Sequence, residues 1–580
     1  MLRNSLISDE DMDAEEEYSN ENVNFVEDTV IEVQDTPGID HLAVNSRKEQ
    51  SQSGRAPDRN LNREWSSSSE HHTQIPIFLG STLPDIDDIS SPHKYFSLFF
   101  DDGILDQIVQ QSNLYSLQQD INKPLNLTIA ELEKWLGLLL YFSLSKLPNT
   151  RMHWAKEFAP LTDYAADCMS PDRFEAIKRN LHLADNTEQA ASGENNYDPL
   201  YKVRPLINHL RTKFQNITKK QNLCIDQQMV PYKGKTRLKQ YLPNKPKKWS
   251  CKLFVLSDVE GLMYDFIPYT GKIAPVEDPN IPDLKVCSNI VLHLAQNIPS
   301  DQNFLLFFDN SFTSIPLLQH LAERGIWCCG TVRMPRLAGL PKSVSDDKSI
   351  IRNGRGSHEE LKLQHHNSEV ILVRWYDNKI VNLVSTFAKA NPVVTISRFD
   401  KTKKKVIEIP CPDIVQRYNK SMGGVDLAHH LLALYRINTK AKKCYHKLIY
   451  HFIDMAVVNA WLLYRRDAVT ISLNKNEILS LASFKLHVAF TLTKRGKACQ
   501  QFKHGRPSSR LSDTDAKRTC GYPSNEIHFA KVAHMPFFSD KRKKCKNTNC
   551  SGKTHIYCQE CNINLCLNKH KNCFASFHGF

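Results

Sequence analysis

A chain of 580 residues is too long for one hydrophobic core and predicts several compact units. Its 41% hydrophobic and 24% charged residues are typical of a mostly globular chain, and neither an apolar run long enough to cross a bilayer nor a secretory signal is found, so we expect neither a membrane nor a secreted protein. The net charge of +12 combines −12 on residues 1–40 (13 acidic side chains and one basic) with +24 on the rest, which favours a polyanionic partner such as nucleic acid over a merely basic soluble protein.

Residues 1–90 are acidic and rich in serine, with few periodic apolar positions, and this composition predicts disorder. From residue 91 to about 221, apolar residues recur at helical spacing, as in the series Leu132, Leu136, Leu139 and Leu140. These stripes predict a helical region whose apolar faces form a core.

The period changes near residue 223. Residues 223–225 predict a short strand, 253–256 and 263–267 a hairpin around Glu260 and Gly261, and 304–308 a strand buried on both faces. A helix over 317–323 follows, so this part predicts a mixed α/β core.

Residues 337–410 contain strand-like pieces at 370–375, 380–387 and 393–396. Helical patterns return at 425–434 and 445–464. A basic connector over 494–544 leads to a terminal cluster that holds six of the 16 cysteines within the last 36 residues.

Three aspartates are candidates for chemistry. Asp226 follows the 223–225 strand, Asp309 follows the 304–308 strand, and Asp426 follows Gly424 before a helix. Carboxylates at strand ends can hold the divalent cations that phosphoryl transfer requires. Aspartate is also an ordinary turn or helix-cap residue, and the spacing alone does not bring the three together.

The sequence segments around these aspartates resemble those of a known protein family. The segments 224–234, 240–249, 309–317 and 418–426 resemble the motifs of the piggyBac transposase family, as do the shorter segments 170–174, 180–182 and 458–461, in consistent order from residue 91 onward. The resemblance implies a ribonuclease H-like α/β core with Asp226, Asp309 and Asp426 as the catalytic, Mg²⁺-binding triad. It further implies a nuclear homodimer that cuts and rejoins double-stranded DNA at TTAA targets, using two Mg²⁺ ions and no small-molecule substrate.

This sequence departs from the family pattern at several positions. Three residues after Asp426, where many active members carry a further aspartate, the chain has His429. Ser311 and Cys444 stand where tryptophans are expected, and Gln227 where glutamate is frequent. The departures keep open an alternative, a domesticated and catalytically inactive DNA-binding or chromatin protein.

Basic stretches flank two of the aspartates. Between residues 233 and 252 there are eight Lys or Arg and no acid, with Tyr232, Tyr241 and Trp249 interleaved, a pattern suited to tracking a nucleic-acid backbone and stacking on bases. A second patch follows Asp426, and Lys541–Lys544 fits a nuclear-import signal. The predicted DNA-binding residues are Lys233, Lys235, Arg237, Lys245, Lys247, Lys248, Trp249, Arg436, Lys440 and Lys443.

The terminal cysteines predict two zinc ions, because two tetrahedral sites need eight ligands and so short a segment needs metal to stay folded. In one interleaved pairing, the first ion is bound by Cys545, Cys550, Cys566 and His570. The second ion is then bound by Cys558, Cys561, Cys573 and His578. Such a cross-brace also resembles RING modules, which leaves a ubiquitin-ligase scaffold as a less favoured function.

The predicted organisation follows from these patterns. The ranges are a disordered acidic region (1–90), a helical DNA-binding and dimerisation region in two parts (91–221 and 436–515), a ribonuclease H-like catalytic core in two parts (222–336 and 411–435), an inserted β-rich domain (337–410), a linker (516–539) and a zinc-binding domain (540–580).

Overall fold

The computed structural model describes residues 65–67, 73–84, 86, 88–155, 163–191, 193–242, 248–365, 368–400, 403–438, 443–494, 536–548, 550–559, 561–568 and 570–578. The chain divides into two compact units, 1–496 and 497–580. None of the described helices has the length and apolar character that a membrane span needs.

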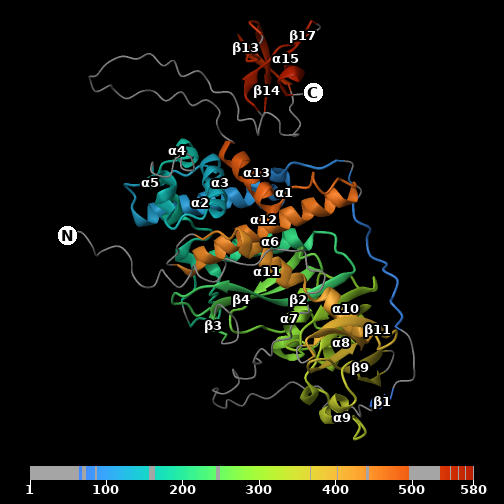
Figure 1. Ribbon diagram of the computed structural model, residues 1–580. Helices are drawn as coiled ribbons and strands as arrows, with labels where there is room; N and C mark the ends of the chain where they lie inside the picture. The colour runs from blue at the N-terminus through green and yellow to red at the C-terminus, as the bar shows by residue number, and fades with distance from the viewer. Residues whose placement is uncertain are drawn as a thin grey trace, which may run out of the picture. The chain divides into compact units, whose positions relative to one another are not determined.

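A group of helices precedes and follows the sheet in the first unit (Figure 1). Two of them, α3 and α13, pack so closely that a Cβ on Gly137 would lie 2.7 Å from the Ala489 carbonyl oxygen. The helices predicted over 91–221 and 445–464 are therefore confirmed. The group comprises α1 (Pro92–Ser97), α2 (Asp102–Gln119), α3 (Ile129–Ser145), α4 (Asp163–Cys168), α5 (Pro171–Asn180), α6 (Arg204–Gln215), α12 (Cys444–Thr470) and α13 (Leu481–Lys494).

The centre of the unit is a mixed sheet of order β5-β4-β2-β6-β7. Strand β2 runs antiparallel to β4 and parallel to β6, and β6 runs parallel to β7. Every residue of β6 is buried, as its continuous apolar run predicts. The strands are β2 (Asn222–Pro231), β3 (Lys239–Tyr241), β4 (Trp249–Asp258), β5 (Met263–Pro268), β6 (Phe304–Phe308) and β7 (Ile326–Thr331).

Helices cover both faces of this sheet. Helix α8 (Ile315–Glu323) follows Phe312, whose ring meets Phe254 of β4 edge-on at 5.7 Å. The other face carries α10 (Asp413–Ser421), α11 (Gly424–Leu434) and α12, since α11 contacts Cys224 and α12 contacts Gln228. Helix α7 (Lys285–Ala295) adjoins α8 through a 3.0 Å contact between Ser288 and Ser314 hydroxyls.

The strands of the 337–410 segment extend the same sheet. Strand β10 (Ile380–Ser385) pairs with β7, and β9 (Ser368–Tyr376) and β8 (His358–His365) continue outward. Strands β11 (Val394–Asp400) and β12 (Lys405–Cys411) form a separate hairpin, and α9 (Asp347–Arg352) precedes β8.

Two predictions need correction. Strand β2 is longer than 223–225 and continues through Asp226 to residue 231, because its second half pairs with β4 along its whole length. The predicted disorder of 1–90 does not hold for β1 (Trp65–Ser67), which pairs with β8 and buries Trp65, nor near Phe78, whose ring packs against Phe304 at 5.0 Å. These aromatic side chains supply apolar burial that the surrounding composition lacks.

The second unit contains β13 (Pro536–Lys544), β14 (Lys553–Cys558) and β15 (Ile563–Asn564) in one sheet, β16 (Leu567–Asn568) and β17 (Lys571–Asn572) in another, and the helix α15 (Cys573–His578). Its buried core consists of six cysteines with Ile563, Leu565, Phe574 and Phe577. So few apolar side chains stabilise a fold only weakly, which favours stabilisation by metal.

Candidate active site and nucleic-acid interface

Asp226 and Asp309 lie side by side on neighbouring strands. The parallel register pairs Ile225 of β2 with Phe308 of β6, and the residue that follows each of these two is one of the aspartates. Adjacent strands are about 4.8 Å apart, and paired residues point to the same face. The spacing of 83 residues, uninformative in the sequence, is the offset of this register.

Asp309 is held by the turn that follows β6. The Ser311 amide donates to one carboxylate oxygen at 2.8 Å, and the Ser311 hydroxyl donates to the other at 3.2 Å. Burial raises the pKa of the Asp309 carboxyl above its ordinary value, although these hydrogen bonds oppose the shift. The guanidinium of Arg336 fixes the turn by donating to the Asn310 carbonyl at 2.5 Å.

Thr331 continues the row formed by the two aspartates. Phe308 pairs with Gly330 of β7, so Thr331 stands level with Asp309 on the next parallel strand. The phenol of Tyr418, on α10, is buried close to both aspartates; burial first and then their charges raise its pKa well above its ordinary value. Helix α10 therefore closes one side of the row.

Asp426 lies in the first turn of α11, where its side chain is exposed. The helix approaches the sheet so closely that a Cβ on Gly424 would lie 1.9 Å from the Asp258 carbonyl oxygen and 2.9 Å from the Cys224 sulfur. Only glycine fits there. Cys224 precedes Asp226 by two residues, so α11 packs on the face of β2 that carries Asp226.

The three carboxylates do not form a closed ligand set. Among the described residues, only groups from the second unit bring three or more ligand atoms of His, Cys, Asp or Glu within 4.8 Å of one another. The structure thus brings Asp226 and Asp309 together and sets Asp426 on a helix packed over the same face.

His429 stands one turn after Asp426 on α11. It is close enough to His451 of α12 that its charge, after burial and the charge of Arg436, helps to lower the pKa of His451 well below its ordinary value. The His451 ring lies 2.8 Å from the Gln228 side-chain oxygen, again on the Asp226 face of β2. The buried Gln228–His451 pair was not expected, because His451 occupies one place in a long apolar helix pattern.

The segment between β2 and β4 forms an exposed basic hairpin, built from 232–242 and 248–252. Lys233, Lys235, Arg237 and Lys248 are exposed. Trp249 is 45% and Tyr241 50% exposed, with their rings 4.8 Å apart. The Lys239 ammonium lies 4.4 Å from the centre of the Trp249 ring. Two adjoining aromatic faces among cations suit contact with bases and phosphates.

A second group of aromatic and basic residues gathers at the start of α12. Tyr115 stacks on His182 at 3.5 Å, and the Lys443 ammonium lies 5.6 Å from Tyr115 and 5.5 Å from Tyr445. The Lys202 ammonium lies 5.5 Å from Tyr445, and burial, then repulsion from Lys443, lowers its pKa. Of this group, only Lys443 was among the predicted DNA-binding residues; Tyr115, His182 and Lys202 come from distant segments of the chain.

Some predicted interface residues have other positions. Tyr232 is buried, because it packs beside Cys251 and Cys444, so its predicted stacking role is wrong. Arg436 is half-buried. Three predicted residues lie outside the described part of the chain: Lys245, Lys247 and Lys440.

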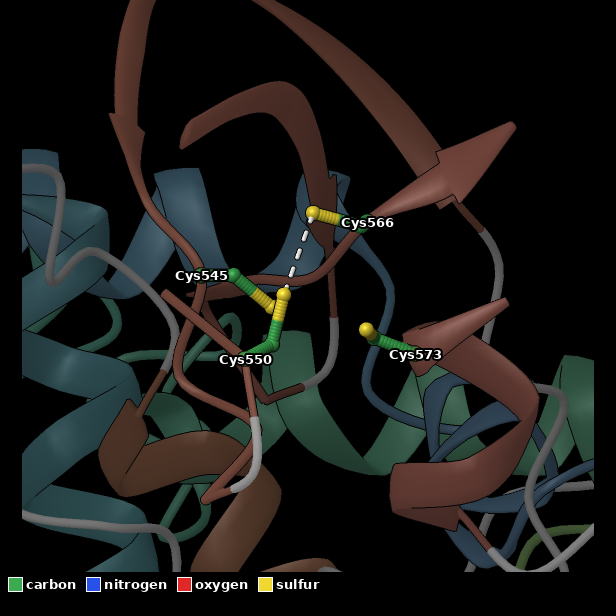
Figure 2. Close-up of side chains that lie close together, drawn as sticks. All are labelled: Cys545, Cys550, Cys566 and Cys573. Atoms are coloured by element: carbon green, nitrogen blue, oxygen red, sulfur yellow. Dashed lines mark hydrogen bonds between the residues drawn. The ribbon is translucent and has the colours of Figure 1, made fainter. Parts of the chain in front are cut away.

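Four cysteines of the second unit converge on one point (Figure 2). The sulfurs of Cys550 and Cys566 are 3.9 Å apart, and the Gly552 amide donates to the Cys550 sulfur at 3.4 Å. That hydrogen bond, followed by the neighbouring thiols, lowers the pKa of Cys550 to about 7. A tetrahedral set of thiolates is a typical structural zinc site. The four are Cys545, Cys550, Cys566 and Cys573.

A second group contains Cys558, Cys561 and His578. The Cys561 sulfur lies 3.4 Å from Nε2 of His578. The other ring nitrogen, Nδ1, lies 2.8 Å from the Phe574 carbonyl oxygen, to which it must donate. Nε2 is therefore left with its lone pair directed at the cysteines, as in a metal-binding histidine.

The observed grouping differs from the predicted pairing. Cys573 joins the first set in place of His570, because α15 begins at Cys573 and carries it toward Cys550, whereas His570 is exposed on the β16–β17 turn. The described residues supply three ligands to the second group.

Comparisons with known proteins show which proteins this chain is similar to. Residues 91–461 match the family model described as Transposase IS4. Human PiggyBac transposable element-derived protein 3 is 27% identical over 498 residues, 84% of this chain and 76% of the relative. Human PiggyBac transposable element-derived protein 2 is 29% identical over 506 residues, 85% of this chain and 78% of the relative. A cryo-EM structure of the piggyBac transposase synaptic complex with hairpin DNA shares the fold, with a TM-score of 0.57 and 20% identity, over 83% of this chain and 97% of that one.

Proposed function

Because this chain belongs to the piggyBac transposase family, we propose that it is a nuclear DNA transposase that acts as a homodimer and cuts and rejoins double-stranded DNA at TTAA sites. Asp226, Asp309 and Asp426 are its metal-binding carboxylates. The observation that carries the proposal is the β2/β6 register, which sets Asp226 beside Asp309 in the middle of a sheet covered by the helix of Asp426.

The carboxylate oxygens of Asp226 and Asp309 fit a hard cation such as Mg²⁺. Burial raises the pKa of Asp309, and a cation bound there would offset that cost to the ionised form. Bound Mg²⁺ supplies charge stabilisation for in-line displacement at a phosphodiester. The chain's own part is to hold the carboxylates in register and to keep the Asp309 turn fixed through Ser311 and Arg336.

The basic hairpin supplies a surface for DNA beside this site. Its strand β4 pairs directly with β2, so Trp249 and its neighbouring cations lie on the sheet that bears Asp226. Exposed cations bind the phosphate backbone with little sequence preference. The group at the start of α12, with Lys202 and Lys443, offers a second phosphate contact.

The two groups in the second unit hold zinc. Four cysteine sulfurs match the ligands of a structural zinc ion. A Cβ at position 552 would lie 3.3 Å from the Cys566 sulfur, and because Gly552 has no side chain, that space beside the sulfurs stays free. Cys558, Cys561 and His578 fit a second ion, for which the His578 tautomer is already fixed.

The proposal is tested by excision in cells of a reporter flanked by the terminal repeats nearest the coding sequence. We expect excision by the unaltered chain and none by Asp309→Ala, with DNA affinity of the variant retained. Lys420→Ala, an exposed substitution at the end of α10, is the control and keeps activity. Excision that survives Asp309→Ala would contradict the assignment of the site.

A second candidate function is a domesticated DNA-binding protein without catalysis. The specific observation in its favour is that His429 stands where a carboxylate is expected, and that its charge acts on the His451 ring in the same direction as the charges of Arg436 and Lys447. The discriminating variant is His429→Asp. If the unaltered chain binds DNA in nuclei without excision and His429→Asp restores excision, the non-catalytic function is supported.

A further inference from the structure

Two cysteines that no site described above uses face each other at the base of the basic hairpin. The sulfur of Cys251, on β4, lies 3.8 Å from the sulfur of Cys444, although 193 residues separate them in the chain. Cys251 is 4% exposed, whereas Cys444 is half-buried and can be reached from solvent. The arrangement is asymmetric, with one accessible thiol and one sheltered thiol behind it.

The surroundings favour the thiolate at Cys444. It is the first residue of α12, a helix of 27 residues whose N-terminal amides carry partial positive charge. A hydrogen bond from the Cys251 thiol lowers the pKa of Cys444, with a smaller contribution from Thr236, while burial opposes the shift. The same contact and burial raise the pKa of Cys251, which keeps its proton.

The polar groups that face the pair are few. Lys239 is the register partner of Cys251 on β3, and its charge acts on that thiol. Tyr232 packs beside both sulfurs and is buried. Lys443 precedes Cys444 and is exposed. Among the described residues, the groups that act on the two thiols include no carboxylate, so no negative charge there opposes formation of a thiolate.

We propose that Cys444 and Cys251 form a peroxide-reactive dithiol that closes to an intramolecular disulfide. The Cys444 thiolate attacks a hydroperoxide oxygen, an S–O bond forms, the O–O bond breaks, and water or an alcohol leaves with a proton. Cys251 then attacks the resulting sulfenic sulfur; an S–S bond forms and the hydroxyl leaves as water with the Cys251 proton. Two thiols are oxidised and one hydroperoxide is reduced.

The sulfurs must close from 3.8 Å to about 2.05 Å, which requires a movement of less than about 2 Å. The bond would join the β4 strand of the basic hairpin to the start of α12 and so fix the hairpin against the helical region. Its formation does not depend on the proposed function, because it needs only the folded chain and a hydroperoxide.

The sequence offers a direct measurement. Trypsin cleaves after Lys248 and Lys252 and after Lys443 and Lys447, which isolates each cysteine in its own tetrapeptide, 249–252 and 444–447. The folded full-length protein is treated with hydrogen peroxide, alkylated, digested without reductant and analysed by mass spectrometry. We expect loss of both free tetrapeptides and appearance of their cross-linked product, which lacks two hydrogen atoms and separates again on reduction.

Two variants identify the roles. In Cys251→Ser, Cys444 should accumulate as a sulfenic acid that a dimedone probe traps; in Cys444→Ser, Cys251 should stay reduced. Cys287, half-buried on α7, reports general oxidation in the same digests. Cross-linking no faster than modification of Cys287, or an absence of trapped sulfenic acid at Cys444 in Cys251→Ser, would overturn the proposal.

Discussion

Lys485→Met tests how the segment between α11 and α12 is anchored. The Lys485 ammonium lies 3.0 Å from one oxygen of Asp454, and both side chains are 3% exposed. Asp454 also accepts from the Ile437 amide at 2.9 Å, and Lys485 donates to the Tyr435 carbonyl at 2.6 Å. The pair thus holds the residues that directly follow α11, the helix of Asp426.

The magnitude follows from burial. Methionine fills the space of the lysine stem but leaves Asp454 buried without a counter-charge, which costs about 3–5 kcal/mol of the free energy of unfolding. Loss of the hydrogen bond to the Tyr435 carbonyl adds roughly 1 kcal/mol. Replacing both members, Asp454→Leu with Lys485→Met, removes the unpaired buried charge and should recover the about 3–5 kcal/mol assigned to it, while about 1–3 kcal/mol for the unpaired Ile437 amide and roughly 1 kcal/mol for the Tyr435 carbonyl stay lost.

The sign of the pH dependence is a further check. Burial raises the pKa of Asp454 above its unfolded value, and removing Lys485, which lowers that pKa, raises it more. The penalty for the ionised carboxylate is complete above the folded-state pKa and disappears as the pH falls through it. The destabilisation by Lys485→Met should therefore be smaller at about pH 5 than at about pH 8.

The assay is urea unfolding followed by tryptophan fluorescence. All seven tryptophans lie in the first unit, so the signal reports that unit alone. Lys475→Met removes an exposed lysine and should change stability by less than about 0.5 kcal/mol. A loss for Lys485→Met no larger than for Lys475→Met, or one that grows as the pH falls, would refute the reasoning.

Three further predictions concern the proposed sites. Asp309→Asn should leave the free energy of unfolding unchanged or raise it, since burial disfavours the ionised carboxyl, while excision is lost; a clear loss of stability would contradict this. Zinc released on denaturation, measured with a chromogenic chelator, should fall by one ion per chain in Cys573→Ser and stay constant in His570→Ala, whereas a loss of one ion in His570→Ala as well would restore the predicted pairing. Removing three exposed cations of the basic hairpin should reduce the slope of log affinity for DNA against log salt by about 2.7, whereas an equal charge change on the β11–β12 hairpin should not; the two triple alanine variants replace Lys233, Lys235 and Arg237, and Lys403, Lys404 and Lys405.

Local patterns predicted most of the elements. The continuous apolar run at 304–308 is the buried strand β6, and the helical periodicity of 445–464 is α12. These predictions succeed because burial on both faces of a strand, or along one side of a helix, leaves a periodicity in the chain itself. The end of β2 was missed because residues 226–231 mix polar and apolar side chains and become a strand only through pairing with β4.

The sites divide in the same way. The residue types named the chemistry, since aspartates after strands and clustered cysteines indicate hard and soft metal ligands respectively. Which cysteines lie together was decided by the place where α15 begins, and Tyr232 proved to be buried although it alternates with exposed cations.

The sequence by itself determined that this chain has a helical region, an α/β core, a basic surface and a cysteine-rich end, and its motifs resemble the piggyBac family. Only the tertiary structure decided that Asp226 stands beside Asp309, that Lys443 meets Tyr115, and that Cys251 faces Cys444. Such contacts join residues far apart in the chain. They depend on strand register and helix packing. A local sequence is compatible with several registers and packing arrangements, and only the assembled core selects one of them.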